Sequence, residues 1–98
     1  MPPDPPEKPP ASIFKPYRTL RGRILRLLDW AEHHGITSTE VHQMIPGISY
    51  STATNELGKL VREGLAVNTG EQRATPTGSL ADIIVLPHYA PGQLVRSN

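Results

Sequence analysis

The chain has no cysteine among its 98 residues, which excludes disulfide bonds, thiolate nucleophiles and cysteine-ligated metal ions. Aromatic residues make up only 5% of the chain. No apolar run approaches the roughly 20 residues that a membrane-spanning helix needs. The net charge is only +1, so overall charge does not by itself indicate a nucleic-acid partner. These absences predict a soluble cytoplasmic protein without membrane contact.

Enzymatic motifs are also lacking. The sequence contains no glycine-rich phosphate loop, no nucleophile elbow and no paired carboxylates in a plausible cleft, so we expect neither an enzyme nor a cofactor. The neighbours His33 and His34 point to different faces of one helix, and with His42 they lack the spacing of a zinc site. Near a helix C-terminus they are favourable partners of the helix dipole when protonated. Because a domain this small leaves little room for a pocket, no small-molecule ligand is expected.

Proline is concentrated at one end of the chain. Residues 1–16 hold seven of the eleven prolines, which predicts an extended, mobile arm. The folded domain is expected over residues 17–87, and residues 88–98 are expected to be an irregular tail. A core of roughly 70 residues is marginal, because it buries only about 60% of the surface of the unfolded chain. Many domains of this size gain stability by dimerising, so a homodimer is expected.

A first helix is predicted from about Arg18 to His34, ended by Gly35. Its apolar stripe repeats at helical spacing and comprises Leu20, Ile24, Leu27, Leu28 and Ala31. Leu25 and Trp30 lie on the two flanks of that stripe. They either pack against the arm or the hairpin, or they form the seam of a dimer.

A capping box predicts a second, short helix. Thr37 is a plausible N-cap and Glu40 occurs three residues later, which places a helix over Ser38–Met44. Pro46-Gly47 then makes a turn, since neither residue continues a helix comfortably. Ile36, just before the cap, can form a strand of one or two residues that pairs with a later hairpin.

Start and stop signals also delimit a third helix. Ser49 caps Tyr50–Glu63 and Gly64 ends it. The residues after Gly64 have the alternation and the turn formers of a β-hairpin. Its expected parts are the strand Leu65–Thr69, the polar loop Gly70–Ser79 and the strand Leu80–Leu86.

Polar residues and one glycine gather on one side of the predicted third helix, opposite its apolar positions. These residues are Ser51, Thr52, Asn55, Gly58, Lys59 and Arg62. Entry into a DNA groove favours this arrangement, with short donors and acceptors near base edges and long cations near phosphates. Asn55 suits the paired hydrogen bonds of adenine, and Lys59 and Arg62 suit phosphates. The plain alternative is the polar outer face of any surface helix.

Four further features can each be interpreted as a DNA contact or as an ordinary structural feature. Tyr50 either stacks on a sugar-phosphate or covers the turn, and Gly58 suggests close approach of another surface or tolerated drift. Arg73 has the position of a wing-tip arginine that enters a minor groove, or it is a solvated loop residue. Five cations and no acid occur between Lys15 and Arg26, either as a solvated face or as phosphate contacts. The candidate phosphate contacts are Arg18, Arg21 and Arg23.

The segment from Arg23 to Leu86 resembles winged helix-turn-helix domains of bacterial and phage regulators, including the multiple-antibiotic-resistance-regulator and arsenical-repressor types. The resemblance lies in TSTEVHQMI, in SYSTATNELGKLVREGLAV and in the GEQRATPTG wing. It implies an α+β winged helix of three helices and a small antiparallel hairpin. It also implies sequence-specific binding of double-stranded DNA by a homodimer, as in a transcriptional regulator of a phage or mobile element.

Two other roles fit the same architecture. A winged-helix adaptor in a replication or recombination assembly would suit the near-neutral charge, with Leu25 and Trp30 as anchors. An accessory DNA-architecture factor, acting in excision or segregation, would bind tandem sites cooperatively and bend DNA. The target sequence, the direction of regulation and any effector are not readable from the residues.

Overall fold

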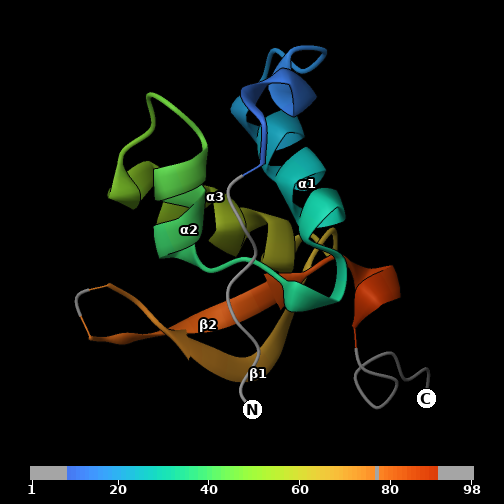
Figure 1. Ribbon diagram of the computed structural model, residues 1–98. Helices are drawn as coiled ribbons and strands as arrows, with labels where there is room; N and C mark the ends of the chain where they lie inside the picture. The colour runs from blue at the N-terminus through green and yellow to red at the C-terminus, as the bar shows by residue number, and fades with distance from the viewer. Residues whose placement is uncertain (1–8, 77, 91–98) are drawn as a thin grey trace.

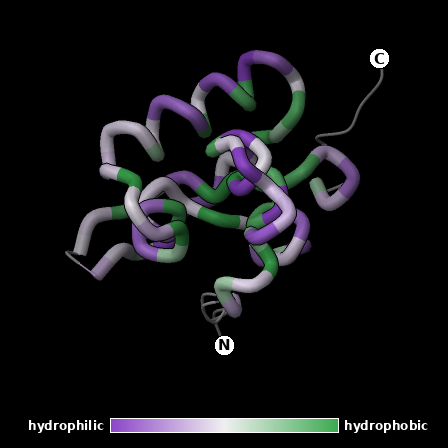
Figure 2. Tube along the Cα trace, turned by 90° about the horizontal axis from the view of Figure 1, so that it is seen from above, coloured by the Kyte–Doolittle hydropathy of each residue, from purple (hydrophilic) through white to green (hydrophobic). Residues whose placement is uncertain are grey.

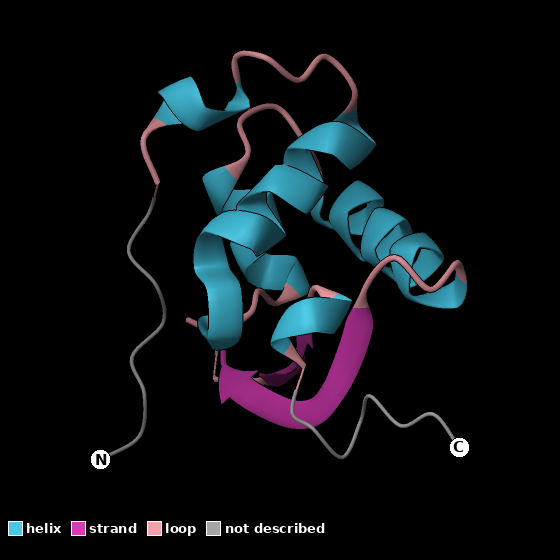
Figure 3. Cartoon of the chain, turned by 90° about the vertical axis from the view of Figure 1, so that its right-hand side faces the viewer, coloured by secondary structure: helices cyan, strands magenta, loops and turns pink. Residues whose placement is uncertain are grey.

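The computed structural model describes residues 9–76 and 78–90, which form three α-helices and one two-stranded antiparallel sheet. The elements are α1 (Leu20–Ala31), α2 (Ser38–Met44), α3 (Tyr50–Arg62), β1 (Val67–Ala74) and β2 (Leu80–Val85). The expected α+β class is therefore confirmed. The helices gather on one side of the hairpin, as seen in two perpendicular views (Figures 1 and 3).

Helices α2 and α3 begin at the predicted caps. The Thr37 hydroxyl accepts a hydrogen bond from the Glu40 amide (3.3 Å), and the Glu40 carboxylate accepts one from the Thr37 amide (3.1 Å). The Ser49 hydroxyl accepts from the Thr52 amide in the same way (3.1 Å). Side-chain oxygens thus satisfy amides that a helix N-terminus leaves without intrahelical partners. Because such capping needs only neighbouring residues, it was readable from sequence.

Helix α1 is shorter than predicted, and Gly35 does not end it. The α-helix stops at Ala31, Glu32 adopts a left-handed φ of 54°, and residues Glu32–His34 form a 3₁₀ turn. Gly35 instead lies against β2, where a Cβ atom would come within 2.4 Å of the Ile83 Cγ2 atom. Its φ of 69° also favours glycine. The glycine therefore allows the α1–α2 connection to approach the sheet.

That close approach allows a single residue, Ile36, to pair with the outer side of the hairpin. Ile36 and Ile84 exchange two backbone hydrogen bonds, of 2.8 and 2.9 Å, in an isolated antiparallel bridge. The prediction that Ile36 pairs with the hairpin is confirmed. Since Ile36 directly precedes the Thr37 cap, the bridge fixes the N-terminus of α2 relative to β2.

The hydrophobic core lies between the helices and the base of the hairpin, and hydrophobic segments converge there when the molecule is seen from above (Figure 2). All three helices contribute, and Leu25 and Trp30 of α1 are partly buried against this core. Its buried members within the helices include Ile24, Leu27, Leu28, Val41, Met44, Ala53, Leu57 and Leu60. The predicted apolar stripe of the first helix is therefore confirmed as its inward face, with Leu20 only partly buried.

The N-terminal arm departs from its prediction over residues 9–16. Residues Ala11–Phe14 form a 3₁₀ turn, and the Phe14 side chain is only 3% exposed within the core. The prediction of a mobile arm is wrong for this part, because an aromatic side chain outweighs the bias of the surrounding prolines by burying a large apolar area. The rest of the predicted arm, residues 1–8, lies outside the described residues, as do 91–98 of the predicted tail.

The hairpin is longer and less regular than predicted. Strand β1 continues to Ala74. Its register with β2 shifts between Asn68 and Gln72, where residues 69–71 of β1 lie opposite the single residue Ile83 of β2. Gly70 adopts a φ of 81° inside this bulge. The bulge interrupts the strand pattern, which explains why sequence alone ended the strand at Thr69.

Across residues 9–76 and 78–90, no helix combines the length and apolar character required to cross a bilayer.

Candidate nucleic-acid interface

The polar side of α3 lies at the surface of the protein. Ser51, Asn55 and Arg62 are exposed and succeed one another at spacings of four and seven residues, so they form one line along the helix. Gly58 stands on the same line between Asn55 and Arg62. The residues beside that line, Thr52, Thr54 and Lys59, are exposed as well. We call this surface the α3 outer face; its six side chains are exposed, and only its Thr54–Gly58 edge borders the hairpin.

The polar side chains on the first two turns of α3 differ in whether their hydrogen-bonding groups already have partners within the protein. The Thr52 hydroxyl accepts a hydrogen bond from Ser49 (3.0 Å), and the Thr54 hydroxyl donates to the Tyr50 carbonyl (3.0 Å). By contrast, the Asn55 amide makes no side-chain hydrogen bond to the described residues. Asn55 therefore presents both a donor and an acceptor to an external partner.

The C-terminal half of the α3 outer face is cationic. Lys59 lies 3.4 Å from Glu56, and its side chain is 50% exposed, so a phosphate can compete with this weak surface pair. Arg62 is exposed and has no ion pair within the described chain. The two cations stand one and two turns beyond Asn55. The charge of the face thus rises toward the end of the helix.

The candidate phosphate contacts at the start of α1 are not equally available. Arg21 makes two hydrogen bonds to Glu63, just beyond α3, and these hold the pKa of that carboxyl below its usual range. Arg23 donates through Nε to the Tyr17 carbonyl (2.9 Å). Of these three arginines, Arg18 alone is exposed and makes no hydrogen bond or ion pair within residues 9–76 and 78–90. Arg21 and Arg23 therefore have structural partners that the sequence did not reveal.

One flank of α3 borders the hairpin. A hollow between them is lined by Thr54, Gly58, Asn68 and Asp82, among others. Asp82 accepts hydrogen bonds from the Asn68 and Gln72 amides (both 3.0 Å), which lower its pKa. These bonds bridge the two strands around the bulge. The hairpin therefore presents amides and one ionised carboxylate beside the α3 outer face.

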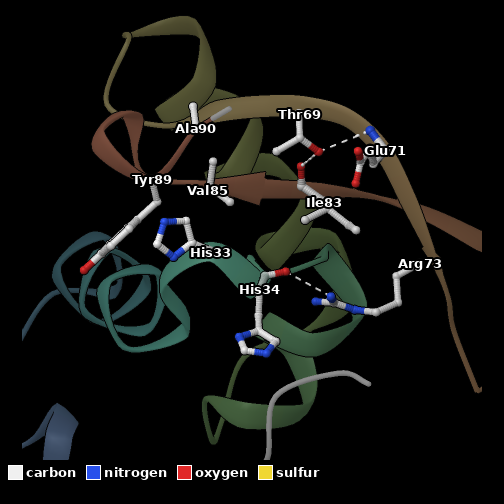
Figure 4. Close-up of a pocket in the computed structure, with 9 residues that line it drawn as sticks. All are labelled: His33, His34, Thr69, Glu71, Arg73, Ile83, Val85, Tyr89 and Ala90. Atoms are coloured by element: carbon white, nitrogen blue, oxygen red, sulfur yellow. Dashed lines mark hydrogen bonds between the residues drawn. The ribbon is translucent and has the colours of Figure 1, made fainter. Parts of the chain in front are cut away.

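Arg73 does not point out of the wing, and the prediction of a wing-tip arginine is corrected. Its guanidinium makes two hydrogen bonds to the Glu40 carboxylate (2.7 and 2.8 Å) and two to the carbonyls of His34 and Gly35 (2.9 and 2.8 Å). Figure 4 shows it directed toward the His34 carbonyl. We call this set of bonds the Arg73 clamp. It joins the hairpin to the cap of α2.

Tyr50, at the start of α3, is 52% exposed and stands edge-on to His42, with ring centroids 6.4 Å apart. The tyrosine thus partly covers α2 and still presents half of its surface. Leu80, at the start of β2, is 63% exposed and lines a second hollow together with Tyr50 and His42. The two side chains form an apolar border between the α3 outer face and the hairpin tip.

A pocket of about 540 Å³ lies on the other face of the hairpin, against the α1–α2 connection (Figure 4). Ile83, Val85 and Tyr89 line it, whereas Asp82 and Ile84 lie on the strand face toward α3. The expectation that a domain this small has little room for a pocket is therefore wrong. Among residues 9–76 and 78–90, no group of three or more histidine, aspartate or glutamate side chains is arranged to hold a metal ion.

The α3 outer face was predictable from the sequence, whereas two tertiary features, the Arg73 clamp and the burial of Phe14, were not. Glu40 carried a signal only for capping, and Arg73 resembled any cation in a polar loop. The ion pair between Glu40 and Arg73 joins residues that lie 33 positions apart in the sequence. Comparison of the chain with family models, with curated proteins and with solved structures gives no match.

Proposed function

We propose that this protein binds double-stranded DNA as a winged helix, with α3 in the major groove and the hairpin as the wing. The observation that carries the proposal is the α3 outer face, which is polar, uncovered and cationic toward its end. A major groove admits an α-helix, and such a face places short polar groups near bases and cations near phosphates.

The packing of the neighbouring elements supports the same role. Helix α2 packs against α3, and the Arg73 clamp ties the hairpin to the start of α2. Base reading needs a helix held rigidly by its scaffold, because small displacements lose directional hydrogen bonds. We assign the binding to transcription regulation in a phage or mobile element, the role that the resemblance to winged-helix regulators implies.

We expect Lys59→Ala to weaken binding to a labelled pool of random 20-base-pair duplexes and to reduce the slope of log affinity against log salt by about one unit. The physical reason is the loss of one phosphate contact. Fluorescence polarisation over a salt series measures both quantities. Lys59→Arg keeps the charge at the same position, should keep the slope, and serves as the matched control. Equal slopes for Lys59→Ala and the unaltered protein, or no binding at all, would refute the proposal.

Gly58→Ala should have opposite effects on two quantities, raising the free energy of unfolding and lowering the affinity for DNA. An added Cβ would meet only the Arg62 Nη1 atom, at 3.7 Å, so it fits the free protein. Alanine should then stabilise α3 by about 1 kcal/mol, because glycine is a poor helix former. Since Gly58 stands on the line of Ser51, Asn55 and Arg62, the same methyl group should obstruct a closely apposed duplex.

Urea unfolding and polarisation on the same Gly58→Ala sample test this prediction. A stabilised variant with reduced affinity supports close approach of DNA at Gly58. A stabilised variant with unchanged affinity would place the duplex elsewhere.

A further inference from the structure

The first two turns of α3 carry no lysine or arginine, and Lys59 is the first cation of the helix. In the major groove, guanine presents two acceptors, and the residues that commonly read it are arginine and lysine. Any reading of bases by the N-terminal half of α3 must therefore use short, uncharged side chains.

The hydrogen bonds within α3 narrow this choice further. Thr52 and Thr54 engage their hydroxyls with Ser49 and with the Tyr50 carbonyl, which holds each side chain in place. Both residues are nevertheless exposed, so their methyl groups contribute to the surface. The Asn55 amide, next to Thr54 on the helix, keeps its donor and its acceptor free within the described chain.

These groups match one base pair better than the other. An asparagine amide offers one donor and one acceptor side by side, which complement N7 and the N6 amino group of adenine. Threonine methyl groups pack against the C5-methyl of thymine. Cytosine, with its amino donor, is best read by a carboxylate. The two carboxylates beside this half of α3 are already engaged, Glu56 with Lys59 and Asp82 with the Gln72 and Asn68 amides.

We infer that α3 reads A·T base pairs in the major groove, with Asn55 on adenine and Thr54 against the methyl of a thymine. The inference rests on the proposed DNA binding and adds the class of sequence. Lys59 and Arg62 supply phosphate contacts that do not discriminate between bases. Specificity and affinity are thus divided between the two halves of one helix.

The test uses the full chain and labelled duplexes with constant flanks and a six-base-pair core, randomised within either A·T or G·C pairs. We expect the A·T pool to bind about tenfold more tightly at one fixed salt concentration. Asn55→Ala should remove most of this preference while retaining the salt dependence. Competition by unlabelled pools in fluorescence polarisation measures the ratio.

Two modified cores locate the reading. Inosine·cytosine pairs present the major-groove pattern of G·C and the minor-groove pattern of A·T, so binding should fall to the level of the G·C pool. Uracil in place of thymine removes only the C5-methyl, and should weaken the unaltered protein more than Thr54→Ser. The serine variant keeps the hydroxyl that bonds to Tyr50.

The outcomes separate the two proposals. Equal affinity for both pools, with a salt slope that Lys59→Ala still reduces, would reject the A·T preference and leave DNA binding supported. Full affinity for inosine·cytosine cores would place the reading in the minor groove and also reject the inference. Absence of binding to either pool would overturn both.

Discussion

Replacing Arg73 with methionine should lower the free energy of unfolding by about 3–5 kcal/mol, the range for breaking one side of a buried ion pair. The Arg73 and Glu40 side chains are only 9% and 11% exposed. The variant leaves the Glu40 carboxylate without its counter-ion and the carbonyls of His34 and Gly35 without their donor. Urea unfolding, monitored by circular dichroism, measures the loss. In a domain of this size the melting temperature should fall on the order of 20 °C.

Two further variants make the result specific to the Arg73 clamp. Arg21→Met removes an arginine from the exposed pair with Glu63 and should cost far less, because surface pairs are weak. Adding Glu40→Gln to Arg73→Met should recover part of the loss, since glutamine keeps the capping geometry without a buried charge. Equal losses for Arg73→Met and Arg21→Met would show that the clamp does not form in solution.

Phe14→Ala should destabilise the fold by about 3–5 kcal/mol, the usual cost of truncating a buried phenylalanine to alanine. Phe14 is 3% exposed and packs in the core that all three helices share. Its removal leaves a cavity beside α1 that neighbouring side chains only partly fill. Fluorescence of Trp30, the single tryptophan of the chain, reports unfolding because this partly buried side chain packs against the same core.

Tyr17→Ala is the matched control, because Tyr17 lies three residues away and is 38% exposed. It removes an aromatic ring of similar size from the surface and should have a much smaller effect. Phe14→Leu should restore most of the stability by refilling the cavity. If Phe14→Ala and Tyr17→Ala unfold at the same urea concentration as the unaltered chain, residues 9–16 are not part of the core.

Both predictions concern features that no local pattern shows. The residues around Phe14 are rich in proline, and proline in a short segment predicts extended backbone whatever the segment later packs against. Whether a single aromatic side chain is buried depends on whether the packing of α1 against the other helices leaves space for it. Likewise, an arginine in a polar loop has the same sequence signature whether it is solvated or bound to Glu40.

The candidate interface was predictable because it depends on helical periodicity and capping. The 3.6-residue repeat separates the exposed positions of α3 from Ala53, Leu57 and Leu60, and the structure confirms this separation. The phosphate contacts expected near α1 were less predictable. Arg21 and Arg23 have partners at Glu63 and at the Tyr17 carbonyl, and the first of these lies 42 residues away.

Sequence by itself therefore determined the number, order and inward faces of the helices, and with them the polar surface that α3 exposes. Those properties arise from interactions within a few residues, in which a cap, a turn glycine or an apolar spacing acts alone. Tertiary structure decided the direction of Arg73, the burial of Phe14 and the bulge that lengthens the hairpin. Each depends on burying a group against a distant segment, where desolvation makes a partner obligatory for a charge and a close fit obligatory for an aromatic ring.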